Sequence, residues 1–283
     1  MSYKIISAIL VLALASLACG FSIDLPKGPT PGPDVTDEIS IPVPASGEAS
    51  LSIKFGAGKL DLAPGAVDKL AAGTATYNIP DLKPQIQQNG SDIQITQGDY
   101  QFKNVVTLGN MKNNWDLKLG GIPMALTVEA GAYDGTMEFG GLSLKSLTIK
   151  DGAANAEVSF SAPNAIEMSV LHYETGASDV TLKGLANANF NNMIFKAGAG
   201  NYELDFSGGL KQDASIDITC GLSDVSLRIP KSVHAVVTVE GGLNNVSTSS
   251  NWSKNGNVYT QGGDGPTLTF TIEMGAGNLT LTD

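Results

Sequence analysis

The sequence is poor in arginine, histidine and tryptophan, and these shortages narrow what the protein can do. Arg228 is the only arginine, and 17 basic residues stand against 28 acidic ones, which gives a formal net charge of −11 at pH 7. Nucleic-acid binding needs clustered Lys and Arg to neutralise phosphates. We therefore predict no nucleic-acid partner, and electrostatic docking on anionic lipid is also disfavoured.

Cysteine and long apolar runs are scarce as well. The two cysteines are Cys19 and Cys220, and the first is assigned below to an anchor. Cys220 then has no partner in the chain, so disulfides should not hold this fold, and we expect it to be a small, partly buried apolar residue. No run is long enough for a transmembrane helix, which takes roughly 20 apolar residues.

The first 18 residues have the layout of a secretory signal. Lys4 precedes an apolar run from Ile5 to Leu17, and small residues follow. This order of a charged, an apolar and a small-residue region predicts a signal peptide over residues 1–18 that is removed on export.

Cys19 follows the predicted cleavage site and is the candidate lipidation residue. The sequence Ala15-Ser16-Leu17-Ala18-Cys19-Gly20 resembles a bacterial lipobox, although Ser16 stands where Leu is more usual. The alternative is ordinary cleavage beside a cysteine that is there by chance. Lipidation predicts an exported protein held by its lipid to the outer face of the cell membrane, at the cell surface.

Residues 19–48 are rich in proline and acidic side chains. Proline fixes its backbone and donates no hydrogen bond, so this stretch predicts an extended, semi-stiff tether. We expect a smaller N-terminal β module at 49–115 and a repeated domain at 116–283.

A four-residue element, Gly followed by two mostly small residues and then Asp or Asn, repeats along the second half of the chain. Successive glycines from Gly131 to Gly242 are 21, 24, 22, 23 and 21 residues apart, and the last step, to Gly275, is 33. An eighth copy, Gly56 to Lys59, lies upstream and departs from the pattern at its last position. The seven regular copies end in Asp134, Asn155, Asp179, Asn201, Asp224, Asn245 and Asn278.

The residues around each glycine alternate with a period of two. All sixteen residues that lie three or five places before the eight glycines are apolar, and the alternation resumes after the corner, as in Tyr202, Leu204 and Phe206. This pattern is typical of strands with one buried face. Gly and Asx suit a tight corner between strands because both tolerate positive φ, and Asx can bond its own backbone.

No single repeat can bury its own apolar face, so stacking is required. The predicted fold is all-β: a β-solenoid-like stack of strand-corner-strand repeats of roughly 22 residues. Seven repeats at the usual spacing between strands would make a column on the order of 30 to 35 Å long. The N-terminal β module should cap one end, since open strand edges invite aggregation. Near Asp283 no cap is visible, which predicts an open edge and, with it, a dimer or filament.

The repeated Gly-x-Gly-Asx corners and stacked strands resemble the bacterial toastrack or putative-adhesin proteins. The segments Phe55-Gly-Ala-Gly-Lys-Leu-Asp-Leu62 and Gly73-Thr-Ala-Thr-Tyr77 are similar to the related domain of cell-wall-active antibiotic response proteins. The resemblance covers most of residues 49–283. It implies the stacked-strand fold, and the family has no established catalytic residues to carry over.

The sequence contains no recognisable motif for catalysis, cofactor binding or metal binding. His172 and His234 lie at even offsets before a repeat glycine, where side chains should point outward. There is no zinc motif, no Walker loop and no Gly-x-Ser-x-Gly elbow. Pairs such as Gly198-Ala-Gly200 are strand corners rather than a dinucleotide fingerprint. We therefore predict no catalytic residue, no cofactor and no metal ligand.

Carboxylates are the one enzymatic alternative. β-Helical glycosidases and lyases place acids on a solenoid face, and the outward candidates here are Glu138, Glu157, Glu203 and Asp205. Acids that alternate with apolar residues are more often the solvated face of a strand. A bound sugar also stacks on aromatic rings, and Trp115 and Trp252 are the only tryptophans.

The Asp and Asn residues of the corners should stack one above another. Aspartate alternates with asparagine through six corners, and two carboxylates about 5 Å apart repel by somewhat under 1 kcal/mol in water. A neutral asparagine between each pair of aspartates therefore reduces the electrostatic repulsion along the column. The functional alternative is a calcium-binding edge, since hard cations prefer oxygen ligands, but the Gly-Gly-x-Gly-x-Asp repeat of calcium-binding β-rolls is absent.

The predicted function is that of a non-enzymatic surface lipoprotein with an adhesion, interaction or scaffolding role. Its expected partners are the membrane, through the lipid at Cys19, and a surface protein or glycan. An envelope-stress accessory protein, suggested by the N-terminal resemblance, and a carbohydrate-active β-helical enzyme are the alternatives.

Overall fold

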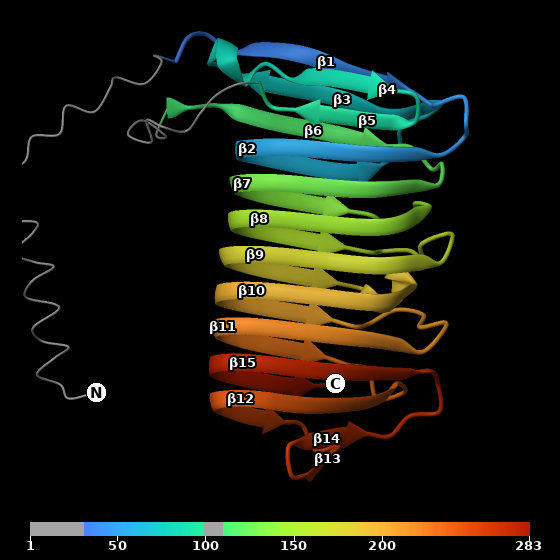
Figure 1. Ribbon diagram of the computed structural model, residues 1–283, viewed down its shortest axis with the longest axis vertical. Helices are drawn as coiled ribbons and strands as arrows, with labels where there is room; N and C mark the ends of the chain where they lie inside the picture. Colours follow the sequence, from blue (N-terminus) through green and yellow to red (C-terminus); the bar gives the residue numbers. More distant parts are fainter. Residues whose placement is uncertain (1–30, 99–109) are drawn as a thin grey trace, which may run out of the picture. The chain divides into compact units, whose positions relative to one another are not determined.

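Strands of 15 or 16 residues that fold back on themselves are the unit of this structure. The computed structural model describes residues 31–98 and 110–283. Each long strand bends at its Gly-x-x-Asx corner, so one arm before the corner and one after it lie in two facing layers (Figure 1). We call such a bent strand a rung. The rungs are β2 (Ala49–Pro64), β7 (Met124–Glu138), β8 (Leu144–Ser159), β9 (Met168–Lys183), β10 (Phe190–Asp205), β11 (Ala214–Arg228), β12 (His234–Thr248) and β15 (Thr267–Thr282).

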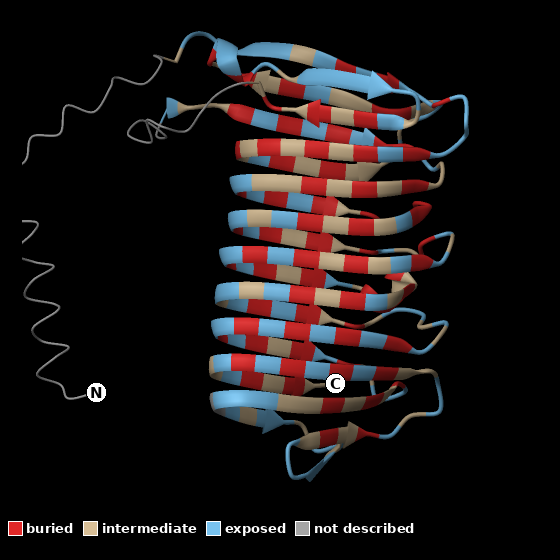
Figure 2. Ribbon diagram, in the orientation of Figure 1, coloured by how far each residue is buried: buried red, intermediate tan, exposed pale blue. Residues whose placement is uncertain are grey.

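Neighbouring rungs pair in parallel and keep the repeat in register. Ile149 of β8 pairs with Tyr173 of β9, three residues before their glycines, and Asn155 pairs with Asp179 at the corner. Side chains alternate between the interior and the surface along both arms (Figure 2). The predicted all-β stack of repeats is therefore confirmed, and the alternation of apolar residues correctly identified the buried face.

The core fills the space between the two layers and is continuous along the stack. Its buried residues run from Ile39 of the first strand to Leu281 of the last rung. Aromatic rings contact one another along the core: Tyr173 of β9 lies 5.7 Å from Phe195 of β10 between ring centroids, and Phe206, directly after β10, lies 5.0 Å from Phe270 of β15. Because each rung leaves its apolar face for the next rung to cover, the column is stable only as a stack.

The first glycine of each corner is required for close packing rather than for positive φ. None of these repeat glycines from Gly131 to Gly275 has a positive φ, whereas Gly200 and Gly277, two residues further along their corners, do, at 153° and 142°. A Cβ at Gly176 would lie 2.4 Å from the carbonyl oxygen of Gly152, and one at Gly198 would lie 2.4 Å from that of Gly176. A side chain here would collide with the backbone of the preceding rung.

Short strands cap the N-terminal end of both layers. On the first arm of β2 lies β5 (Asp92–Thr96), followed by β4 (Gln85–Asn89). On its second arm lie β6 (Asn113–Leu119), β3 (Lys69–Tyr77) and β1 (Val35–Pro42), in that order. The expected cap is present.

The expected boundary between a module at 49–115 and a repeat domain at 116–283 is wrong. Rung β2 pairs with β7 along both arms, from Ala49 to Leu62, so the upstream repeat copy is the first rung of the same column. Residues 31–98 and 111–283 form one compact unit. The short capping strands differ from the repeats but pair with the same column.

The tether predicted for residues 19–48 is also wrong over part of its length. Strand β1 pairs antiparallel with β3, and its Ile39 and Ile41 are 3% and 1% exposed in the core. The proline-rich composition concealed the alternating apolar residues that bury one face of this strand. The signal peptide at 1–18, Cys19 and the tether up to Thr30 lie outside the described residues.

The last two rungs are stacked in the opposite order to the sequence. Strand β15 pairs with β11 on one side and with β12 on the other, so the final segment lies inside the column (Figure 1). The 33-residue step between Gly242 and Gly275 contains the hairpin of β13 (Trp252–Asn255) and β14 (Val258–Gln261), which pairs with the first arm of β12. The open edge expected near Asp283 is therefore not at β15.

Two short 3-10 helices, Pro80–Leu82 and Leu185–Ala188, complete the regular elements of the described chain. Neither is a membrane span, and no helix within residues 31–98 and 110–283 is long and apolar enough to be one.

Candidate functional site

The corner residues form a ladder on the outside of the second arms, beside the bends. Registered pairs join Asp134 to Asn155, Asp179 to Asn201, and Asp224 to Asn278. Asn245 follows Asn278 because β15 lies before β12 in the stack. We call these seven residues the Asx ladder. The expectation that they stack is confirmed, with the last two in exchanged order.

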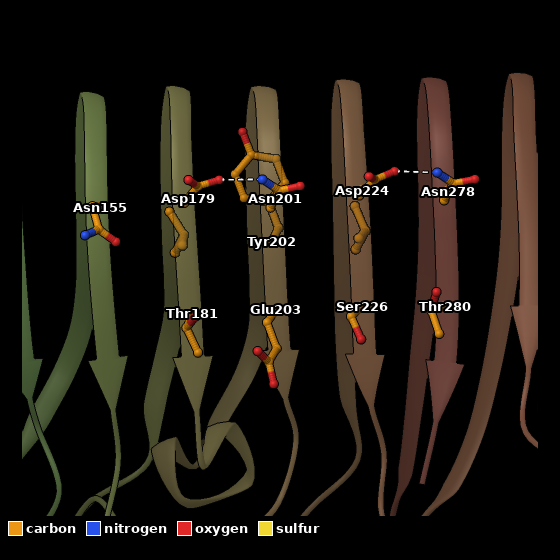
Figure 3. A pocket seen from close by; sticks show the side chains of 12 residues that line it. Asn155, Asp179, Thr181, Asn201, Tyr202, Glu203, Asp224, Ser226, Asn278 and Thr280 are labelled. Carbon is orange, nitrogen blue, oxygen red and sulfur yellow. Dashed lines mark hydrogen bonds between the residues drawn. The ribbon is translucent and has the colours of Figure 1, made fainter.

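The amides of the Asx ladder bond to carboxylates on neighbouring rungs. Asn201 Nδ2 donates to Asp179 Oδ1 at 2.7 Å, and Asn278 Nδ2 donates to Asp224 Oδ1 at 2.6 Å (Figure 3). A longer contact of 3.4 Å joins Asn155 Nδ2 to Asp134 Oδ1. The corner side chains thus tie one rung to the next, whereas the sequence had suggested bonds to their own backbone.

The first rung places a cation at the start of the Asx ladder. Lys59 occupies the corner position in β2 and pairs in register with Asp134. Its Nζ lies 2.5 Å from Asp61 Oδ2, and the hydrogen bond and the charge of Asp61 raise the pKa of Lys59. The first copy thus has Lys59 where the other copies have Asp or Asn, and this lysine places a positive charge beside Asp134.

A shallow groove of about 470 Å³ runs along the Asx ladder across five rungs. One side carries ladder residues from Asn155 to Asn278. A second row two residues further along each strand adds hydroxyl and carboxylate groups (Figure 3); it consists of Thr181, Glu203, Ser226 and Thr280. We call this surface the ladder groove. It presents hydrogen-bonding groups at the regular spacing of parallel strands, about 4.8 Å.

The candidate catalytic carboxylates do not converge. Glu157 Oε2 lies 2.6 Å from Lys183 Nζ, and Asp205 Oδ2 lies 3.4 Å from Arg228 Nη1. Of the four, only Glu203 lines the ladder groove. The acids are spread over β7, β8 and β10, and Glu138, Glu157 and Asp205 each have a structural partner.

Glu138 holds a loop in place. It accepts hydrogen bonds from Ser159 Oγ at 2.5 Å and from Ser161 N and Oγ, both at 3.0 Å. Burial alone would raise the pKa of Glu138, but these bonds and one from the Gly140 amide outweigh it and lower the pKa. The charged form is therefore stabilised by the fold.

The two histidines and both tryptophans offer little for catalysis or sugar stacking. His172 and His234 alternate with buried residues, as predicted, but each is half-buried among its neighbours. Burial lowers the pKa of His172, whose Nε2 lies 3.7 Å from Glu174 Oε2. Trp115 is 1% exposed and packs on Phe55, and Trp252 is packed against the core.

Cys220 is 4% exposed and so more deeply buried than predicted, and burial raises the pKa of its thiol to about 12. Within residues 31–98 and 110–283, no group of three His, Cys, Asp or Glu side chains is placed to hold a metal ion.

Asp151, inside the bend of β8, is a cluster centre that the sequence reasoning missed. Its carboxylate accepts hydrogen bonds from Tyr173 Oη at 2.8 Å, Tyr133 Oη at 3.3 Å, Ser178 Oγ at 3.4 Å and Thr175 Oγ1. Burial raises the pKa of Asp151, and these four bonds oppose the shift. One feature of the sequence could have indicated this cluster. Asp151 directly precedes a corner glycine, where most other rungs carry an uncharged residue.

The arrangement described so far defines a class: a β-solenoid built from two-armed rungs, with an open polar groove on one layer. Residues 30–170 match the family described as the N-terminal domain of toast_rack, DUF2154. Over those residues the chain belongs to the toastrack family, as the repeated corners had suggested.

Solved structures with low sequence identity resemble the chain. One, of a putative cell adhesion protein from Clostridium sporogenes, is 20% identical with a TM-score of 0.49, and the match covers 88% of this chain and 99% of that one. Another, of a putative adhesin from Parabacteroides merdae, is 12% identical with a TM-score of 0.45, over 89% and 97% of the two chains. A putative lipid binding protein from Parabacteroides distasonis is also 12% identical, with a TM-score of 0.36 over 88% and 97%. No curated protein matches the chain.

Proposed function

We propose that the chain is an exported surface lipoprotein whose column acts as a non-enzymatic adhesion or scaffolding element, with the ladder groove as its binding surface. The observation that carries the proposal is the groove itself. Amides, carboxylates and hydroxyls recur there on five successive rungs that the core and the ladder bonds hold rigid. A preorganised surface loses little conformational freedom when it binds.

The chemistry of the groove favours a ligand that is polar and extended. Its lining offers both donors and acceptors along the stack, and the aromatic residue in it, Tyr202, is 2% exposed, so no open ring is available for stacking. A linear glycan or an extended, polar protein segment lying across the strands would meet the same groups on each rung.

The test compares binding to intact cells that display the whole chain. Thr181→Arg with Ser226→Arg places two long side chains in the ladder groove, while Thr219→Arg with Thr271→Arg makes the same changes on the exposed face of the other layer. We expect the first pair to abolish binding to an array of glycans and extracellular-matrix proteins and the second to preserve it. Equal binding by both pairs would show that the groove is not the surface used.

The anchoring part of the proposal has a separate test. Labelled palmitate should be incorporated into the whole chain, and Cys19→Ala should abolish the label and release the protein from membranes. A Cys19→Ala protein that stays membrane-bound would contradict lipid anchoring without affecting the role of the groove.

A further inference from the structure

The C-terminal end of the column has an open strand edge in one layer only. Rung β12 pairs with β15 along both arms. On its outer side β14 pairs with Ala235–Thr238 of the first arm. Among residues 31–98 and 110–283, no strand pairs with the outer side of the second arm, Asn245–Thr248. We call this four-residue segment the β12 edge.

Two residues of the β12 edge direct their backbone N–H and C=O groups away from the column. Ser249 N donates to Leu281 O at 2.9 Å, which directs the amide of Ser249 toward β15. Because successive residues of a strand direct their backbone groups to opposite sides, the amides and carbonyls of Val246 and Thr248 face away from β15. In the rungs before it, the amides at the corresponding side of the strand bond to the next rung, as Phe206 N does to Arg228 O at 2.8 Å.

The β12 edge has none of the features that protect other edges. Residues 241–253 contain no charged residue and no proline. At the opposite end of the column, β1 carries Asp37, Glu38 and Pro42, and Pro84 lies directly before β4. Charges and prolines on an edge discourage pairing with another strand. The β12 edge is therefore unprotected against pairing with another strand.

We propose that the β12 edge pairs antiparallel with the β12 edge of a second copy of this chain, about a two-fold axis. A segment that pairs antiparallel with itself satisfies two-fold symmetry without any other partner. The chain carries a net charge of −11, so two copies repel over most of their surfaces, and this neutral segment is where approach is least opposed.

The pairing stops at a dimer and does not depend on what the ladder groove binds. Each copy has one such edge, and an isologous contact uses both. On the other layer the β13–β14 hairpin already covers the first arm of β12. The partner strand would also cover Val246, which is half-buried against the core.

The first test uses single cysteines in the whole chain on intact cells. Ser247→Cys lies in the β12 edge, and Thr280→Cys lies at the same position one rung inward, in β15. Mild oxidation should convert Ser247→Cys into a dimer that a reducing agent reverses, and Thr280→Cys should stay monomeric. Thr36→Cys in β1 detects pairing between opposite ends. Absence of a Ser247→Cys dimer, or cross-linking of Ser247→Cys to Thr36→Cys, would overturn the proposal.

The second test uses charge. Ser247→Lys and Ser247→Glu are changes of an exposed residue, and like charges facing each other across strands disfavour pairing. Co-purification of two differently tagged whole chains should fall about tenfold in either variant alone. It should recover when one tag carries Ser247→Lys and the other Ser247→Glu. If the mixed pair fails to recover, or if neither single variant lowers co-purification, the two edges do not meet.

Discussion

Asn201 Nδ2 and Asp179 Oδ1 are 2.7 Å apart on neighbouring rungs, and this bond joins two corners that are 22 residues apart in the sequence. Asp224, on the other side of Asn201, bonds instead to Asn278. Asp179 and Asp224 therefore each have an amide partner, and neither has another carboxylate next to it in the Asx ladder. The alternation of Asp and Asn therefore gives every ladder aspartate from Asp134 to Asp224 an amide on the neighbouring rung.

Asn201→Asp should destabilise the protein. It places carboxylates on three successive rungs, at Asp179, position 201 and Asp224, and it removes one hydrogen bond. We expect the free energy of unfolding to fall by about 1 to 3 kcal/mol at low salt, and by less at 1 M salt because screening weakens exposed charges. Denaturant unfolding measures both. Asn245→Asp, beside Asn278, adds no neighbouring carboxylate and should have little effect.

Gly176→Ala tests whether the corner glycines are needed for packing. The new Cβ would lie 2.4 Å from the carbonyl oxygen of Gly152, a backbone atom that cannot move alone. A loss of about 1 to 3 kcal/mol in unfolding free energy is expected from this overpacking. Gly121→Ala is the control, since nothing lies within 4 Å of its added Cβ. Equal losses in the two variants would mean that helix or strand propensity, rather than the close approach, accounts for the glycine.

Ile41→Ala tests whether β1 is part of the fold. Ile41 is 1% exposed, and truncation of a buried isoleucine costs about 2 to 5 kcal/mol. Val35, at the start of the same strand, is 45% exposed, so Val35→Ala should cost little. Thermal and denaturant unfolding distinguish the two. Wild-type stability in Ile41→Ala would restore the view that this segment is a tether.

Asp151 should make stability fall as pH rises. Burial raises its folded pKa, so its contribution is fully present below the unfolded pKa of about 3.9 and is lost as pH rises through the folded pKa. Relative to Asp151→Asn, wild type should therefore lose stability as the pH rises above about 3.9. Unfolding measured at a series of pH values tests this.

Glu138 is the control with the opposite sign. Its hydrogen bonds lower the folded pKa, so its contribution is present above the unfolded pKa of about 4.3 and is lost as pH falls. Relative to Glu138→Gln, wild type should gain stability as pH rises. Parallel pH trends for the Asp151 and Glu138 variants would show that the two carboxyls are not held as described.

The buried face of each rung could be predicted from the sequence because alternation of apolar residues depends only on local geometry. Leu171 and Tyr173 illustrate this, since both are buried where the pattern placed them. The order of the rungs could not be predicted in the same way. Each repeat offers an equivalent strand edge. The local sequence of β15 therefore does not show whether it pairs beside β11 or beyond β12.

The candidate site was predictable in part. Stacking of the Asx ladder follows from the repeat spacing, but its direct bonds across rungs depend on side-chain conformations that only the stack determines. The bends that bring Tyr133 and Tyr173 onto Asp151 join three rungs, and no local motif indicates such a contact. Strand β1 was not predicted because the prolines around it are typical of a tether, although Ile39 and Ile41 alternate as in a half-buried strand.

The position of β15 between β11 and β12 sets the order in which the column can be assembled. Residues 214–228 and 234–248 are synthesised before the rung that separates them. Asp224 meets Asn278 only after the chain has passed through β12 and the β13–β14 hairpin, a separation of 54 residues. Rungs β2 to β11 can add one at a time, whereas the last two must dock together. Closing this end is therefore a concerted, non-local step, and such steps are slow to fold.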